Sequence, residues 1–105
     1  MLFKKEHKDM ILKGHKTQTR RIWKRPMVKV GGIYKAKLNY SKDYFAKIQV
    51  TRLYKQRLGD MDIYEAVKEG YTSRLEFQEV WIIINGFWDP NTEVDVIEFR
   101  VVKEE

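Results

Sequence analysis

The sequence predicts a small α+β domain whose strands form a curled or closed sheet. Two observations support this prediction. The segments at 33–38, 44–54 and 94–102 alternate apolar and polar residues with the period of half-buried strands, and the segment at 62–85 shows helical periodicity with two capping signals. A chain of 105 residues suits one hydrophobic core, so we expect residues 1–105 to form a single domain.

Near the start of the chain, the residues KEHKDMILK predict a short helix over Lys5–Lys13. Met10 and either Ile11 or Leu12 are expected to pack inward. Gly14 follows at the position where a left-handed C-terminal cap is expected. The next segment, GHKTQTRRIW, therefore begins where this helix ends.

The first two strands are predicted to form an antiparallel hairpin. A Gly31-Gly32 turn introduces the strand at 33–38, and the loop NYSKD leads into the strand at 44–54. The inward-facing residues are expected to be Tyr34, Ala36 and Leu38, followed by Tyr44, Ala46, Ile48 and Val50.

Two helices are predicted next, because two pairs with capping-box spacing precede helical stripes. Asp62 and Glu65 begin the first helix, which Gly70 ends, and Ser73 and Glu76 begin the second. The inner stripes are Ile63, Ala66 and Val67 in the first helix, and Phe77, Val80, Trp81 and Ile84 in the second. We interpret the second stripe as core rather than as a cofactor-binding surface.

The last predicted strand covers 94–102, and its alternation is broken where Val96 and Ile97 adjoin. A β-bulge would explain the break, because the extra residue shifts which side chains face the core. A strand buried on both faces would explain it equally well. Both explanations stay open at the level of the sequence.

The charged residues divide unequally between the two halves of the chain, whose net charge is +6. Residues 1–57 hold 17 Lys and Arg against 3 Asp and Glu, whereas residues 58–105 hold 4 against 12. The halves could attract each other across their contact. The excess in the first half favours a basic face that binds phosphates, and a protein-interaction domain that docks on a basic partner is the alternative.

The composition also excludes several kinds of site. Cysteine is absent, which rules out disulfides, a thiolate metal site and a cysteine nucleophile, and favours a reducing, cytoplasmic setting. The longest apolar run, VWIII, is too short to span a membrane, and neither His7 nor His15 has a carboxylate in a familiar ligand spacing. We therefore expect a monomer with no metal, no cofactor and no membrane association.

The segment Gly14–Trp23 places lysine, threonine and arginine where a packed core gains nothing from them, so we interpret it as a site. Together with later residues it resembles the ASCH family. The residues that carry the resemblance are Gly14, Lys16, Thr17, Thr19, Arg20, Gly59, Asp60, Glu69, Gly70, Tyr71, Ser73, Glu76, Phe77 and Trp81. The resemblance implies a small β-barrel similar to the PUA domain, with about five to six mostly antiparallel strands, a short N-terminal helix and a helix pair packed at the barrel ends.

The same resemblance implies that a basic cleft around Gly14–Arg21 binds RNA or a modified nucleoside. The residues expected to contact nucleic acid are Lys16, Thr17, Arg20, Arg21, Trp23, Lys24 and Arg25. Trp23 would either stack on an unpaired base or fold onto the barrel. The chain differs from the bacterial deacylases of the family in a longer basic stretch, RRIWKRPMVKVGG, beside this cleft.

Those deacylases are amidohydrolases that remove an acyl group from the exocyclic amine of acetylated cytidine. The resemblance assigns their chemistry to Lys16, Thr19 and Glu69, with Thr19 attacking the acyl carbon and a neutral Lys16 taking its proton. In an extended strand Lys16 and Thr19 would face opposite sides, so we expect the segment to turn. Glu69 could act as the acid or could keep Lys16 charged, and it could also be a surface residue at the end of a helix.

Overall fold

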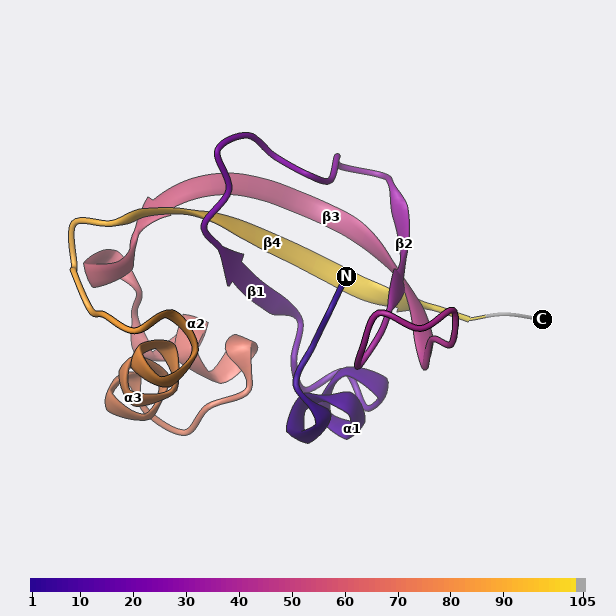
Figure 1. Ribbon diagram of the computed structural model, residues 1–105, viewed down its shortest axis with the longest axis horizontal. Helices are drawn as coiled ribbons and strands as arrows, with labels where there is room; N and C mark the ends of the chain where they lie inside the picture. The colour runs from indigo at the N-terminus through magenta and orange to yellow at the C-terminus, as the bar shows by residue number, and fades with distance from the viewer. Residues whose placement is uncertain (104–105) are drawn as a thin grey trace.

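The computed structural model describes residues 1–103 as one antiparallel four-stranded sheet with three α-helices and two short 3-10 turns (Figure 1). In chain order the elements are a 3-10 turn Lys5–His7, α1 Lys8–Leu12, β1 Gln18–Arg21, β2 Ile33–Ala36, β3 Ala46–Arg57, a 3-10 turn Leu58–Asp60, α2 Ile63–Glu69, α3 Arg74–Asn85 and β4 Glu93–Val102. The strand order is β1-β4-β3-β2, so β1 and β2 are the two edges. The α+β prediction is confirmed, but the described residues form four strands in a curled half-barrel instead of five to six.

The predicted hairpin is formed by β2 and β3, with Ala36 opposite Ala46 and Tyr34 opposite Ile48. Ala36, Ala46, Ile48 and Val50 are buried, as their alternation predicts. Leu38 and Tyr44 are exposed, so their assignment to the inner face was wrong. Because β2 ends at Ala36 and β3 begins at Ala46, both residues lie in the connection, where strand alternation no longer applies.

The helix pair begins and ends at the predicted residues. Asp62 and Glu65 form a reciprocal capping box at the start of α2, and Ser73 accepts a hydrogen bond from the Glu76 amide at the start of α3. Gly70 follows α2 with φ +102°, a conformation that side-chain-bearing residues rarely adopt. The helices therefore have local stop and start signals that need no tertiary contact.

The predicted inner stripes of the two helices are only partly correct. In α2 the buried apolar residue is Ala66, whereas Ile63 and Val67 are exposed. The other buried residue of this short helix is Glu69, which is polar. In α3 Phe77 and Trp81 are buried, but Ile84 is 58% exposed. The outer part of the α3 stripe is thus not core.

The predicted N-terminal helix is confirmed in part, since its first turn is a 3-10 turn and the α-helix covers only Lys8–Leu12. Ile11 is completely buried and Leu12 is exposed, which selects Ile11 as the inward residue. Gly14 has φ +75° and turns the chain toward β1 as expected.

β4 is central in the sheet and buried on both faces. Val96 packs with residues of α2 and α3, including Ala66 and Trp81, whereas the adjacent Ile97 packs with Val28 on the opposite face. This explains the broken alternation in the sequence. The bulge lies in the partner strand instead, between Val50 and Arg52 of β3. 

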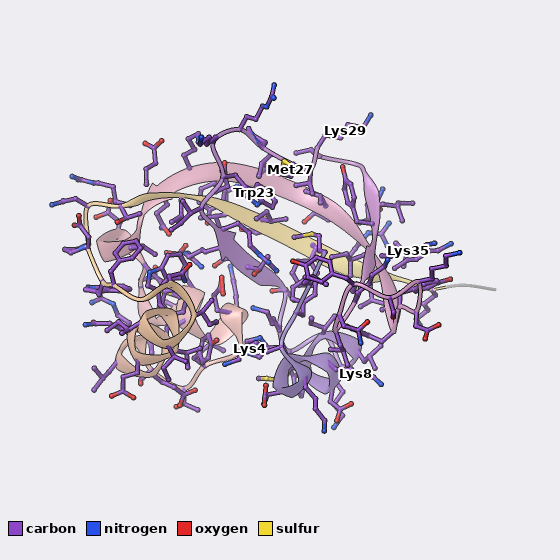
Figure 2. All side chains as sticks on the ribbon, in the orientation of Figure 1. Lys4, Lys8, Trp23, Met27, Lys29 and Lys35 are labelled. Atoms are coloured by element: carbon purple, nitrogen blue, oxygen red, sulfur yellow. The ribbon has the colours of Figure 1, made fainter. Side chains whose placement is uncertain are left out.

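The remaining segments cover the sheet from different sides. In Figure 1, α2 and α3 lie together below one end of the sheet, and α1 lies apart from them near the start of β1. The connection between β1 and β2 passes above the sheet, where Figure 2 shows Met27 and Lys29. β1, α3 and the segment preceding α1 together line a cavity, which is described next.

Candidate functional site

The turn after α1 brings Lys16 to the end of α2. The carbonyl of Met10 accepts hydrogen bonds from the amides of His15 and Lys16 at 2.7 and 3.0 Å. The amide of Thr17 then donates to the carbonyl of Lys68, in the last turn of α2, at 2.9 Å. Lys16 thus lies directly before β1. The chain turns at residues 13–14, ahead of Lys16, and residues 18–21 are extended, so the turn expected between Lys16 and Thr19 is not observed.

The Lys16 ammonium is held by three oxygen acceptors. It donates to the carbonyl of Glu69 at 2.7 Å, to the carbonyl of Gln18 at 2.9 Å and to Glu69 Oε1 at 3.3 Å. Lys16 is only 2% exposed, and Glu69 is buried beside it, so Glu69 is not the surface residue that was one possibility. Three acceptors match the three N–H groups of a charged lysine.

Arg20 fixes the other side of the Glu69 carboxylate. Its guanidinium donates to Glu69 Oε2 at 3.1 Å and to Glu65 Oε2 at 2.7 Å. Gln18 and Gln56 complete the set at 2.6 and 2.8 Å, and no part of the Arg20 side chain is exposed. The expected role of Arg20 as a phosphate contact is therefore corrected: its guanidinium is occupied by protein carboxylates and amides and orients Glu69.

Burial and charge act in opposite directions on Lys16. Burial lowers the pKa of its ammonium, while the Glu69 carboxylate raises that pKa. Burial likewise lowers the pKa of Arg21. The pKa of His7 falls to about 4, first because the ring is buried and second because Lys16 is near, so the imidazole is neutral at pH 7.

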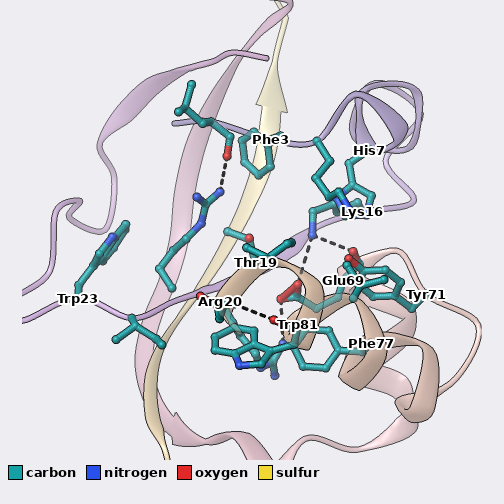
Figure 3. A pocket seen from close by; sticks show the side chains of 17 residues that line it. Phe3, His7, Lys16, Thr19, Arg20, Trp23, Glu69, Tyr71, Phe77 and Trp81 are labelled. Carbon is teal, nitrogen blue, oxygen red and sulfur yellow. Dashed lines mark hydrogen bonds and ion pairs between the residues drawn. The ribbon is translucent and has the colours of Figure 1, made fainter. Parts of the chain in front are cut away.

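A cavity of about 440 Å³ opens at this point, between β1, the segment preceding α1, and α3. Figure 3 shows Lys16, Thr19 and Glu69 together in it, with aromatic rings around them. The apolar and aromatic wall comprises Leu2, Phe3, Ile22, Trp23, Tyr71, Phe77, Val80, Trp81 and Ile84. The outer part of the α3 stripe, assigned to the core from the sequence, thus lines a cavity.

Arg21 supplies positive charge to the cavity. One of its terminal nitrogens donates to the carbonyl of Leu2 at 2.6 Å, and its guanidinium lies 5.3 Å from the centre of the Phe3 ring. A guanidinium has five N–H groups, so this orientation leaves several donors for a ligand. Arg21 is the predicted cation best placed to contact a ligand in the cavity.

The cavity gathers most but not all of the predicted site residues. Its lining includes Lys16, Thr19, Arg20, Arg21, Trp23 and Glu69. Thr17 lines a different hollow, beside Phe99 and Arg100. Lys24 and Arg25 are exposed on the connection between β1 and β2 and do not line the cavity. Trp23 packs against the cluster of Val28, Val50 and Ile97, as one of its two expected roles requires, and its stacking on a base stays a prediction.

Sequence reasoning missed several residues of the cavity. Phe3 and His7 come from the N-terminal segment, and Tyr71 lies 5.3 Å from His7 between ring centres. No motif spacing connects these positions, because they meet only when the N-terminal segment docks beside β2 through the Phe3 amide and the Lys37 carbonyl. The polarity of β1 also concealed that it is a strand.

The unequal charges of the two halves are partly neutralised within the molecule. Arg52 pairs with Glu98 at 3.4 Å, and Lys55 pairs with Asp95 at 3.5 Å, in addition to the contacts of Lys16 and Arg20 with α2. The attraction between the halves is therefore real. It leaves Arg21 and the exposed cations of the connection between β1 and β2 available for other contacts.

The curled antiparallel sheet with helices at its end defines a domain of the PUA-like class. Within that class the chain belongs to the ASCH domain family, whose model matches residues 1–103. Among solved structures it is similar to an ASCH domain from Lactobacillus crispatus JV V101, with 18% identity, a TM-score of 0.66 and coverage of 90% of this chain and 69% of the other.

Two further structures have the same fold. A hypothetical protein, PH0355, is 22% identical with a TM-score of 0.70, over 95% of this chain and 94% of the other. A protein from Enterococcus faecalis V583 is 17% identical with a TM-score of 0.67, over 92% of this chain and 67% of the other. A search of curated proteins finds no match.

Two features of residues 1–103 bear on the expected partners. No helix in this part of the chain is long and apolar enough to cross a membrane. In the same residues, no group of three or more His, Asp or Glu side chains is arranged to hold a metal ion. The absence of cofactors and metals stays a prediction.

Proposed function

We propose that this ASCH domain binds a nucleoside, alone or within RNA, in the cavity beside β1. The observation that carries the proposal is the combination of aromatic walls with a half-buried Arg21. Aromatic rings provide stacking surfaces for a base, and a guanidinium provides paired donors for phosphate or carbonyl oxygens. The acidic Glu69 does not repel such a ligand, because Lys16 and Arg20 neutralise it.

The exposed part of the basic connection extends this surface beyond the cavity. Lys24 and Arg25 follow Trp23 directly, and Trp23 lines the cavity. In RNA, a base in the cavity would place neighbouring phosphates near these cations, which would contribute a salt-dependent part of the affinity.

Binding is tested by titrating the protein with cytidine 5′-monophosphate and with a short single-stranded RNA, using tryptophan fluorescence, since Trp23 and Trp81 line the cavity. Arg21→Gln should weaken binding of the mononucleotide by about tenfold. Lys24→Gln, outside the cavity, should weaken only the RNA and reduce its salt dependence. If neither ligand binds at low salt, the proposal is wrong.

Hydrolysis of an acylated cytidine is the second candidate. It is favoured by one observation, namely that Lys16, Thr19 and Glu69 line the same cavity. The Thr19 hydroxyl would form an ester with the acyl carbon as the bond from that carbon to the exocyclic nitrogen breaks, and the hydroxyl proton would end on that nitrogen. Water would then hydrolyse the ester and release the acid.

The critical step in this scheme is removal of the proton from the Thr19 hydroxyl by Lys16. Burial lowers the pKa of Lys16, which favours a neutral amine, but its three acceptors and the nearby Glu69 favour the ammonium. Lys16 would have to release one acceptor to reach Thr19. A charged Lys16 would instead stabilise the oxyanion, and a different base would then be needed.

Incubation with acetylated cytidine, followed by chromatography, tests the second candidate. Release of cytidine should fall by at least about a hundredfold in Thr19→Ala. Thr17→Ala is the matched control, because Thr17 lies outside this cavity, and it should leave the rate within about twofold. If the unmodified protein releases no cytidine, the second candidate is wrong.

A further inference from the structure

The open edge of β1 faces the cavity. β1 is an edge strand, paired on one side with β4. Just before it, the Thr17 carbonyl accepts a hydrogen bond from the Phe99 amide of β4 at 3.0 Å, while the Thr17 amide donates to the end of α2. Along an antiparallel ladder, successive residues direct their carbonyls alternately toward the partner strand and away from it. Thr19 and Arg21 therefore direct their main-chain groups to β4, while Gln18 and Arg20 direct theirs to the open edge.

The contacts of Gln18 agree with this alternation. Its carbonyl accepts a hydrogen bond from Lys16 Nζ at 2.9 Å, and the same ammonium donates to the Glu69 carbonyl at the end of α2. The main-chain groups of Gln18 consequently point away from β4. By the same two-residue period, those of Arg20 point in the same direction.

The exposed part of Arg20 indicates that its main chain borders the cavity. The Arg20 side chain is 0% exposed, whereas the whole residue is 5% exposed, so its accessible part is main chain. Thr19–Trp23 also line the cavity without interruption. Side chains alternate between the two faces of a strand, so an unbroken run of lining residues requires that the strand edge itself borders the cavity.

The Arg20 amide and carbonyl have no other partner in the part of the chain that the structure describes. Outside the ladder with β4, the hydrogen bonds of residues 1–103 that involve Arg20 all come from its guanidinium. Main-chain polar groups at the border of a largely apolar cavity are costly to leave unpaired. A ligand with matching groups would therefore gain from pairing with both.

We propose that the N–H and C=O of Arg20 read the edge of a nucleobase, as a two-point main-chain site within the nucleoside cavity. The inference rests on the proposed binding function and adds how the base is recognised. The N–H requires an acceptor and the C=O requires a donor directly beside it. Each base presents such a pair on one edge, and in cytosine, which serves as the probe, it consists of the ring nitrogen N3 and the exocyclic N4–H.

A base fits this edge better than an added peptide strand. The end of α2 occupies the edge at Thr17, whose amide donates to the Lys68 carbonyl, so the edge is free only over a short stretch around Arg20. Peptide strands need several consecutive main-chain pairs for affinity. Two hydrogen bonds beside the ring of Trp81 and the other aromatic walls suit a planar base instead.

The experiment compares three nucleosides by NMR on the ¹⁵N-labelled full chain. Cytidine offers both groups, 3-deazacytidine lacks the ring acceptor, and N4,N4-dimethylcytidine lacks the donor. Cytidine should shift the Arg20 amide resonance and slow its hydrogen exchange. Each analogue should bind about tenfold more weakly, because each loses one hydrogen bond and leaves one main-chain group unpaired.

A side-chain variant provides the matched control. Arg21→Gln should reduce the affinity for all three nucleosides by the same factor, since Arg21 contacts the ligand through its guanidinium and not through the base edge. A selective loss for cytidine alone would instead assign the base edge to Arg21 and overturn the proposal.

The possible outcomes separate this inference from the binding function. If cytidine perturbs the indole signals of Trp23 and Trp81, but the Arg20 amide does not move and the analogues bind equally well, the base-edge inference is wrong and nucleoside binding stands. If none of the nucleosides perturbs any cavity signal, both are wrong. If only an extended peptide shifts the Arg20 amide, the edge serves strand addition and the inference fails.

Discussion

Neutralising Glu69 should destabilise the fold strongly, because it separates two buried charges from their shared partner. In Glu69→Gln the Lys16 ammonium, 2% exposed, keeps two carbonyl acceptors but loses its counter-charge. Removing one member of a buried pair costs about 3–5 kcal/mol, and the remaining acceptors place this case at about 3 kcal/mol. For a domain of this size that corresponds to a fall of at least about 10 °C in Tm.

Urea unfolding followed by tryptophan fluorescence measures this effect, and a double-mutant cycle identifies its source. Lys16→Met and Glu69→Gln together should cost at least about 1–2 kcal/mol less than the sum of the two single changes. The control is Glu65→Gln, because Glu65 is partly exposed and contacts Arg20 rather than Lys16. It should cost clearly less than Glu69→Gln.

The same variant has a defined pH dependence. Burial already lowers the pKa of Lys16 below 10.5 in the folded chain, and loss of Glu69 lowers it further. Between the folded pKa and 10.5 the unfolded chain binds more protons, so the stability of the variant rises with pH. Its deficit should be largest near neutral pH and shrink toward alkaline pH. A cost below about 1 kcal/mol, or additive single changes, would refute the buried-pair reasoning.

Two further predictions concern stability. Because the folded pKa of His7 is lowered from 6.5 to about 4, the folded chain should lose stability as pH falls through this range, by up to about 3 kcal/mol; His7→Gln should abolish that part of the acid sensitivity measured by urea unfolding at several pH values. Gly70→Ala should cost about 1–2 kcal/mol, since φ is +102° and the new Cβ would lie 3.3 Å from Met10, whereas Gly14→Ala, with φ +75° and open space, should cost less in the same assay; equal costs would show that the contact with Met10 is unimportant.

The sequence correctly predicted the elements that bury apolar side chains, but it did not predict β1, which buries polar side chains. The hairpin of β2 and β3 follows from alternation, and the capping pairs mark both helix starts. β1 gave no such signal, because its buried residues Gln18 and Arg20 are polar. Arg20 is bound by Glu65 and Glu69, on a helix more than forty residues later, and Gln18 in turn accepts a hydrogen bond from Arg20. Such partners cannot be recognised from local periodicity.

The candidate site was predicted to a similar extent. The resemblance gave Lys16, Thr19 and Glu69, and the structure places all three at one cavity. The free surface of Arg20 could not be anticipated, because residue type describes a side chain and the exposed part is main chain. Likewise, the spacing of apolar residues in the α3 stripe that includes Ile84 is the same whether the stripe packs in the core or lines a cavity.

The bulge between Val50 and Arg52 has a consequence for comparing this chain with its relatives. Before it, Ile48 packs beside Phe3 and Ile11; after it, residues of even number such as Tyr54 and Gln56 point to the opposite side, toward the carboxylate of Glu65. The extra residue therefore moves the even-numbered side chains of β3 from one face of the sheet to the other. Relatives that lack this extra residue should carry the polar side chains one position earlier in the strand. An alignment without a gap there would pair apolar core positions of one protein with the polar positions that face Glu65 in the other.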